Sequence, residues 1–168
     1  KMNKEISGTT FIITRNGNSV KLDFSPSFPL FTEVKSVAIN GKSVPFKIVE
    51  QPESVRLVLD PIDFTGEKLT LSVSHEGGTA ILSPTNSPVP GKETSEVKIL
   101  SQKRIGSHLL VVVEGKPGTT CQLKLFSHDK IEEISGGQIT AIQGGVQTIE
   151  ITLPESSEKY IQKELIIN

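Results

Sequence analysis

The side chains best suited to acid–base or metal chemistry in this chain are three histidines, His75, His108 and His128. No two of them have the i, i+2 or i, i+4 spacing that brings ligands onto one face of a strand or helix. Asp129 follows His128 and could orient an imidazole base, but neighbouring residues on a strand point to opposite faces. We therefore expect ordinary surface or strand-end histidines. A small β-sandwich enzyme built on His128 and Asp129 is the catalytic alternative.

Cys121 is the single cysteine and the only thiol of the chain. It alternates with Leu123 and Leu125, which predicts an inward-facing position on a strand, where cysteine acts as a small hydrophobe. A lone cysteine also excludes an internal disulfide and a zinc site made of cysteines. We expect Cys121 to be a core residue rather than a nucleophile.

Two acidic pairs could supply the carboxylates of a glycoside hydrolase: Asp60 with Asp63, and Glu132 with Glu133. The first pair lies in a loop that contains proline, where Asp commonly stabilises turns. Asp60 and Asp63 could also bind calcium, but no DxDxDG loop surrounds them. The second pair fits a solvated strand edge. We expect no catalytic residue, no metal site and no cofactor.

Composition limits the partners that the chain can have. Its 168 residues fit one large or two small domains, and 35 % hydrophobic residues are enough to build a core. The net charge is −1 without long runs of like charge, so we expect no nucleic acid partner. The longest apolar run, Leu109–Val113, is too short for a membrane span. The opening KMNKEIS lacks the features of a signal peptide, which is expected of a mature or excised segment.

The elements that position these side chains are strands, because apolar and polar residues alternate with period two and no 3.6-residue pattern is sustained. Asn16-Gly17 and Asn40-Gly41 each separate two such runs. Asn-Gly tolerates the positive φ angles of a type I′ turn, so both predict β-hairpins. Inward strand faces are expected at Val20, Leu22 and Phe24, at Val44, Phe46 and Ile48, at Val55, Leu57 and Leu59, and at Leu69, Leu71 and Val73.

Residues 77–96 interrupt this pattern with three prolines and many small polar residues, which is typical of an extended linker. Strand patterns resume at Val97 and recur at the short intervals of an immunoglobulin-like domain. Leu109–Val113 is apolar on both faces, as expected of a central strand, and Gly144-Gly145 predicts a hairpin.

The chain is therefore expected to be all-β, with two tandem antiparallel β-sandwich domains, the second immunoglobulin-like. The expected limits are 1–80 for the first domain, 81–96 for a linker rich in Pro and Ser, and 97–168 for the second domain. Ala80-Ile81-Leu82 is alternatively a last edge strand of the first domain.

The aromatic residues disfavour a stacking platform for sugars or single strands, since the chain has no Trp and one Tyr. Phe28 and Phe31 bracket Pro29-Leu30 at a corner between strands. These four residues either plug the base of the first domain or form an exposed surface that docks on a neighbouring domain.

The corner and the strands around it resemble a known type of segment. Phe24-Ser25-Pro26, Phe28-Pro29-Leu30 and Ile39-Asn40-Gly41-Lys42, with Glu76-Gly77-Gly78 further on, are similar to the β-rich C-terminal accessory segments of large bacterial glycoside hydrolases. The catalytic part of those enzymes is an (α/α)6 barrel, so the resemblance implies no catalytic residue in this chain. It implies an exported, carbohydrate-linked context and a packing role.

The expected function is a non-catalytic accessory segment of a secreted bacterial carbohydrate-active protein, which braces or spaces a catalytic domain. Its partner would be a neighbouring domain of the same or a parent protein. The alternative from another class is a binding module or adhesin that holds a glycan or a protein. Localisation is expected to be periplasmic, cell-surface or secreted.

Overall fold

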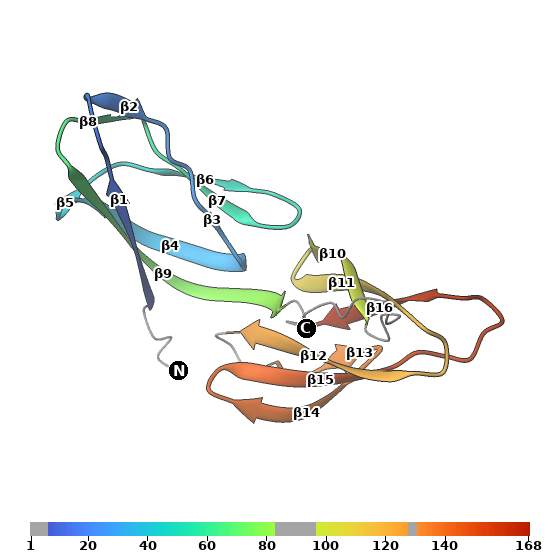
Figure 1. Ribbon diagram of the computed structural model, residues 1–168. Coiled ribbons are helices and arrows are strands. Elements are labelled where there is room, and N and C mark those ends of the chain that lie inside the picture. The colour runs from blue at the N-terminus through green and yellow to red at the C-terminus, as the bar shows by residue number, and fades with distance from the viewer. Residues whose placement is uncertain (1–6, 83–96, 128–130) are drawn as a thin grey trace. The chain divides into compact units, whose positions relative to one another are not determined.

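The computed structural model describes residues 7–82, 97–127 and 131–168 (Figure 1). The fold is all-β: strands form several antiparallel sheets, and no helix occurs among the described residues. The chain divides into two compact units, Lys1–Gly78 and Thr79–Asn168, called unit one and unit two below. In the part of the chain that the structure describes, no helix is long and apolar enough to cross a membrane.

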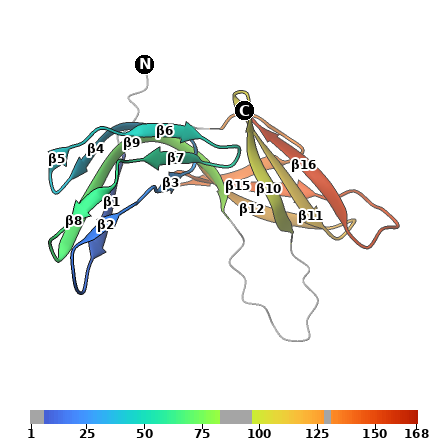
Figure 2. The ribbon, with the colours of Figure 1, turned by 90° about the horizontal axis from the view of Figure 1, so that it is seen from above.

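Unit one is built from three sets of paired strands (Figure 2). In the first, β9 pairs with β1 and lies next to β4, which forms a hairpin with β5; the others are the pair β2–β8 and the three strands β3, β7 and β6. The strands are β1 (Ser7–Thr14), β2 (Val20–Leu22), β3 (Ser27–Phe28), β4 (Leu30–Ile39), β5 (Lys42–Ser43), β6 (Lys47–Glu50), β7 (Val55–Val58), β8 (Ile62–Phe64) and β9 (Lys68–Leu82).

The core of unit one collects apolar side chains from all three sets of strands. Period-two alternation correctly predicted the buried faces of β7 and β9. Partly buried side chains from β1, β2 and β4 pack against the same core. The buried members are Phe28, Val37, Leu57, Leu59, Phe64, Leu69, Leu71 and Val73.

The hairpin predicted at Asn16-Gly17 is wrong. β1 pairs with β9 along its whole length, whereas β2 pairs with β8 in a different sheet. A type I′ turn needs positive φ at both central residues, and here only Gly17 has one, at 117°. The segment therefore carries the chain between sheets, and Phe11 and Leu22 reach one core from different sheets.

The hairpin predicted at Asn40-Gly41 is confirmed. Ile39 pairs with Lys42, and the two turn residues have φ angles of 50° and 79°. The expectation that Val44, Phe46 and Ile48 share one strand face is wrong, because β5 pairs with β4 and β6 pairs with β7. Since the chain changes sheets between β5 and β6, Val44 and Phe46 still pack on the core while Ile48 is exposed.

Unit two contains two sets of strands. In one, the end of β9 pairs with β12, followed by β15 and β14; in the other the order is β10, β11, β16 and β13. The backbone N–H of Ile81 donates a 3.2 Å hydrogen bond to the Gln102 side chain and so connects β9 with β10. The strands are β10 (Lys98–Ile105), β11 (His108–Gly115), β12 (Thr120–Ser127), β13 (Ile134–Ser135), β14 (Gln138–Gln143), β15 (Val146–Thr152) and β16 (Ile161–Ile167).

Two features of unit two were predicted correctly. The apolar run Leu109–Val113 lies in β11, between β10 and β16, so it is a central strand. Gly144-Gly145 closes the β14–β15 hairpin with φ angles of 57° and 78°. The most deeply buried apolar side chains of the unit are Leu109, Val111, Val113, Leu123, Leu125, Ile149, Ile151, Leu153, Leu165 and Ile167.

The segment expected to link the two domains begins inside a strand. β9 continues through residue 80 to Leu82, and its last four residues, from Thr79, pair with β12. Ala80, Ile81 and Leu82 are therefore strand residues, and they pair with β12. The rest of the expected linker, 83–96, lies outside the described residues.

Candidate functional site

The two described histidines lie in different units and serve local contacts. Nε2 of His75, on β9, is 3.0 Å from the Thr9 hydroxyl of β1. The His75 ring also lies 5.3 Å from the ring of Phe28, centre to centre. His108, at the start of β11, lies 3.4 Å from the hydroxyl of the preceding serine. The proposed pair His128 and Asp129 lies outside the described residues.

Cys121 is half-buried on β12, opposite Ile151 of β15. Its Sγ lies 3.6 Å from the Ile151 carbonyl oxygen, which can accept a weak hydrogen bond from the thiol. Burial raises the pKa of the thiol, and the nearby positive charge of Lys163 opposes this only in part. A raised pKa keeps the group as a thiol, whereas a nucleophile needs the thiolate.

Neither acidic pair belongs to a larger group of possible metal ligands in the described residues. Among the described residues, no three His, Cys, Asp or Glu side chains gather to hold a metal ion. Asp63 faces Lys21 in the β2–β8 register. Asp60 lies at the edge of a small hollow of about 210 Å³, whose other lining residues are Ile39, Val44, Leu59, Ile62 and two prolines. Glu132 and Glu133 are exposed.

The corner that was considered as a docking surface is largely internal. Phe28 is 6 % exposed, belongs to the core of unit one and packs edge-on against Phe11. Leu30 is 2 % exposed, and Pro29 and Phe31 are half-buried. Only the last two side chains keep accessible area at this corner.

Phe31 has a φ angle of 63°, which is unusual for a bulky residue. Its backbone lies next to two consecutive glycines of β9. Gly77 and Gly78 also have positive φ angles. A Cβ on Gly77 would lie 2.6 Å from the Phe31 carbonyl oxygen. The β4 backbone therefore comes closer to residue 77 than a residue with a side chain would allow. Next to them, Lys35 forms ion pairs with Glu33 and Glu76, which raise the pKa of its ammonium group.

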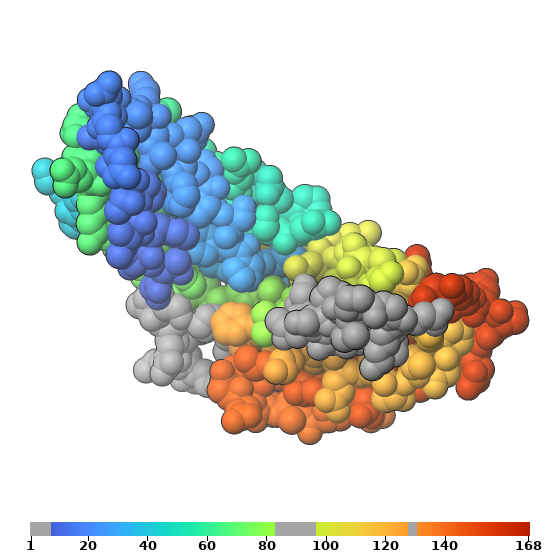
Figure 3. Space-filling model, in the orientation of Figure 1, coloured from blue at the N-terminus to red at the C-terminus, as the bar shows by residue number. Residues whose placement is uncertain are grey.

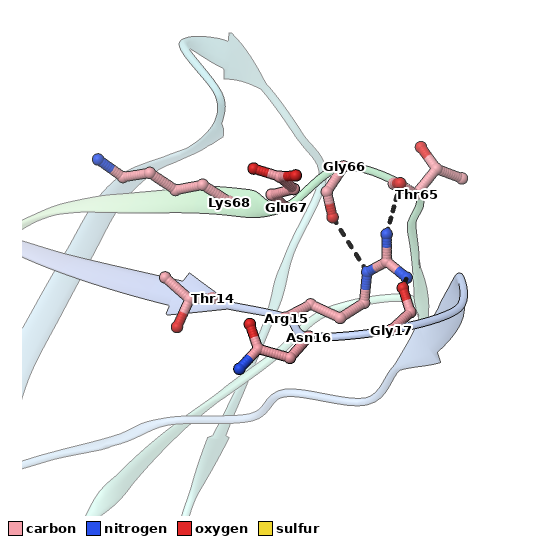
Figure 4. Close-up of a pocket in the computed structure, with 8 residues that line it drawn as sticks. All are labelled: Thr14, Arg15, Asn16, Gly17, Thr65, Gly66, Glu67 and Lys68. Atoms are coloured by element: carbon pink, nitrogen blue, oxygen red, sulfur yellow. Dashed lines mark hydrogen bonds between the residues drawn. The ribbon is translucent and has the colours of Figure 1, made fainter.

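A surface hollow of about 740 Å³ in unit one was not anticipated from the sequence (Figure 4). It lies between the segment that follows β1 and the turn that precedes β9, and Arg15 is at its centre. The register of β1 with β9, which pairs Thr14 with Lys68, brings the two segments together. Its lining residues are Thr14, Arg15, Asn16, Gly17, Thr65, Gly66, Glu67 and Lys68.

The Arg15 guanidinium donates hydrogen bonds to three backbone carbonyl oxygens around it. Nε donates to the Gly66 carbonyl at 3.0 Å, Nη2 donates to the Thr65 carbonyl at 2.7 Å, and Nη1 donates to the Gly17 carbonyl. The guanidinium also lies 5.5 Å above the Phe64 ring. Arg15 therefore holds two turns together, and the side chains available to a solute are those of Asn16, Lys68 and their polar neighbours (Figure 4).

Comparisons with known proteins give no assignment. No protein-family model matches the chain, and neither a curated protein nor a solved structure matches it.

Proposed function

We propose that this chain is a non-catalytic structural module, which braces or spaces a neighbouring domain of the same or a parent protein. The observation that carries this proposal is β9, a strand of 15 residues that serves both units. Its first eight residues pair with β1 in unit one, and its last four pair with β12 in unit two. Only residues 76–78 separate the two paired stretches of β9, and so short a connection suits a spacer.

The proposal includes a finer interpretation of the fold. We take unit one to be a β-sandwich, in which the sheet of β1, β9, β4 and β5 faces the shorter strands across one core. We take unit two to be an immunoglobulin-like sandwich of two four-stranded sheets. Support comes from the strand order of each sheet and from the alternating buried positions on β11, β12, β15 and β16.

The carbohydrate-linked context of the proposal rests on the resemblance of residues 20–80. In this context the module would be part of an exported bacterial protein, and its partner would be a catalytic domain. The docking surface would be formed by Pro29 and Phe31, because Phe28 and Leu30 are buried.

A binding module is the second candidate, and the hollow around Arg15 favours it. The hollow is large enough for a small polar ligand, and its lining includes Lys68, Asn16 and two threonines. Such a set of donors and acceptors suits a sugar or another polyhydroxylated solute better than an apolar one.

Calorimetric titration of the purified chain with a panel of glycans separates the two candidates. A spacer gives no binding heat and hydrolyses no aryl-glycoside. A binding module gives heat that Lys68→Ala removes and that Lys47→Ala, on exposed β6, leaves unchanged. Reproducible hydrolysis abolished by a single point mutation would overturn the structural role altogether.

A further inference from the structure

We propose that Asn16-Gly17 is a site of spontaneous covalent modification, while the chemically identical Asn40-Gly41 is protected by the fold. In an Asn-Gly sequence the backbone nitrogen of glycine attacks the Asn side-chain carbonyl carbon. The C–N bond formed closes a succinimide ring, and the side-chain nitrogen leaves as ammonia. Water then opens the ring to aspartate or isoaspartate. Glycine favours the attack because no Cβ obstructs it.

Asn40 is held by β9 in a geometry that opposes this attack. Its Oδ1 accepts a 2.9 Å hydrogen bond from the backbone N–H of Thr70, and its own N–H donates to the Thr70 carbonyl at 2.8 Å. The flanking pairs of the β4–β5 hairpin also fix the φ angles of both turn residues. The Asn40 side chain must break its bond to Thr70 before its carbonyl carbon can reach the nitrogen of Gly41.

Asn16 has no such restraint. It is exposed and follows β1 where the chain crosses to another sheet, and within the described residues no hydrogen bond holds its side chain. Figure 4 shows this side chain pointing away from the Arg15 guanidinium. Arg15 binds the carbonyl oxygen of Gly17 and leaves the nitrogen, which is the attacking atom. No atom lies within 4 Å of the position that a Gly17 Cβ would occupy.

The modification would change the hollow around Arg15. Aspartate or isoaspartate at position 16 adds one negative charge to a chain whose net charge is −1, next to Arg15 in a hollow that Lys68 also lines. Isoaspartate also lengthens the backbone by one carbon just before the Gly17 carbonyl that Arg15 holds. The hollow would therefore lose affinity for anions and gain affinity for cations with the age of the protein.

The test is incubation of the full chain at 37 °C and mildly alkaline pH, followed by trypsin and mass spectrometry. Cleavage after Arg15 and Lys21 releases one Asn-Gly, and cleavage after Lys35 and Lys42 releases the other. We expect Asn16 to react at least about tenfold faster than Asn40 in the folded chain, since Asn40 must first lose its Thr70 hydrogen bond. In urea the two rates should agree within about threefold.

Two controls make the result decisive. Fragment ions separate Asn16 from Asn18 in the same peptide, and Asn16→Gln should abolish the modification there. Equal rates in the folded chain, a faster reaction at Asn40, or a rate ratio unchanged by urea would each overturn the proposal. Modification that persists in Asn16→Gln would place the reaction at Asn18 and overturn it as well.

Discussion

Gly77 is the residue at which a single methyl group should do most damage to unit one. Its φ angle is +69°, and a Cβ there would lie 2.6 Å from the Phe31 carbonyl oxygen, closer than real Cβ contacts. For alanine, the left-handed conformation costs about 1–2 kcal/mol. Forcing the β4 backbone to move away costs about 1–3 kcal/mol more, as in other overpacked sites. Gly77→Ala should therefore lower the free energy of unfolding by about 2–5 kcal/mol.

Gly41→Ala is the matched control for this variant. Gly41 has a φ angle of +79°, but nothing lies within 4 Å of the position of its Cβ. It should show only the conformational cost of about 1–2 kcal/mol. The difference between the two variants isolates the close approach of β4 to β9.

The assay is urea unfolding followed by circular dichroism, because the β-sheet signal reports all the paired strands. Unfolding free energies of both variants are compared with the parent chain under the same conditions, with the slopes checked for equality. If Gly77→Ala is destabilised no more than Gly41→Ala, the Phe31 carbonyl does not press on Gly77 and the reasoning is refuted.

Three further predictions concern Arg15, Cys121 and the last residues of β9. Arg15→Lys should lower the free energy of unfolding by about 1–2 kcal/mol, because an ammonium group cannot span the carbonyls that the guanidinium binds. An unchanged urea midpoint would contradict the stabilising role of these Arg15 hydrogen bonds. Cys121 should be alkylated more slowly at pH 8 in the native chain than in urea, because burial raises the pKa of its thiol. Folding stability is unaffected by this thiol below its unfolded pKa of about 8.5, and it is lost as pH rises through the folded value. Equal alkylation rates in the native chain and in urea would contradict the raised pKa. A fragment spanning 79–168 should fold, whereas 97–168 should be less stable, since it lacks the strand that pairs with β12; indistinguishable melting temperatures would contradict this.

The sequence predicted most inward strand faces, because alternation is a local signal that each β-strand carries by itself. Val20 and Ile48 were expected to face inward but are exposed. Leu57, Leu71 and Val111 are buried as their spacing indicates. Pairing is a long-range property and was predicted only where a short turn decided it. The pattern cannot distinguish Asn40-Gly41, which joins paired strands, from Asn16-Gly17, which joins strands of different sheets.

The hollow around Arg15 could not be predicted for the same reason. It exists because the β1–β9 register brings Thr14 opposite Lys68, although these residues are far apart in the sequence. Arg15 itself resembles any surface arginine until the carbonyls of Thr65 and Gly66 are placed beside it. A composition of nearly neutral net charge gives no signal for a local arrangement of this kind.

Three of the residues that carry the sequence resemblance have a structural task in this fold, and this affects where function should be sought. Asn40 connects the β4–β5 hairpin to Thr70, Phe28 fills the core, and Gly77 admits the β4 backbone. Residues that a backbone requires recur wherever that backbone recurs, whatever the protein does. Specific function is then to be sought in side chains that the fold does not need, and unit one exposes such groups at Ile12 of β1 and at Lys68. In Figure 3 the blue residues, which include β1, lie on the visible surface of unit one. Substitutions there should change binding without changing the urea midpoint, whereas substitutions in the resemblance motif should change the midpoint first.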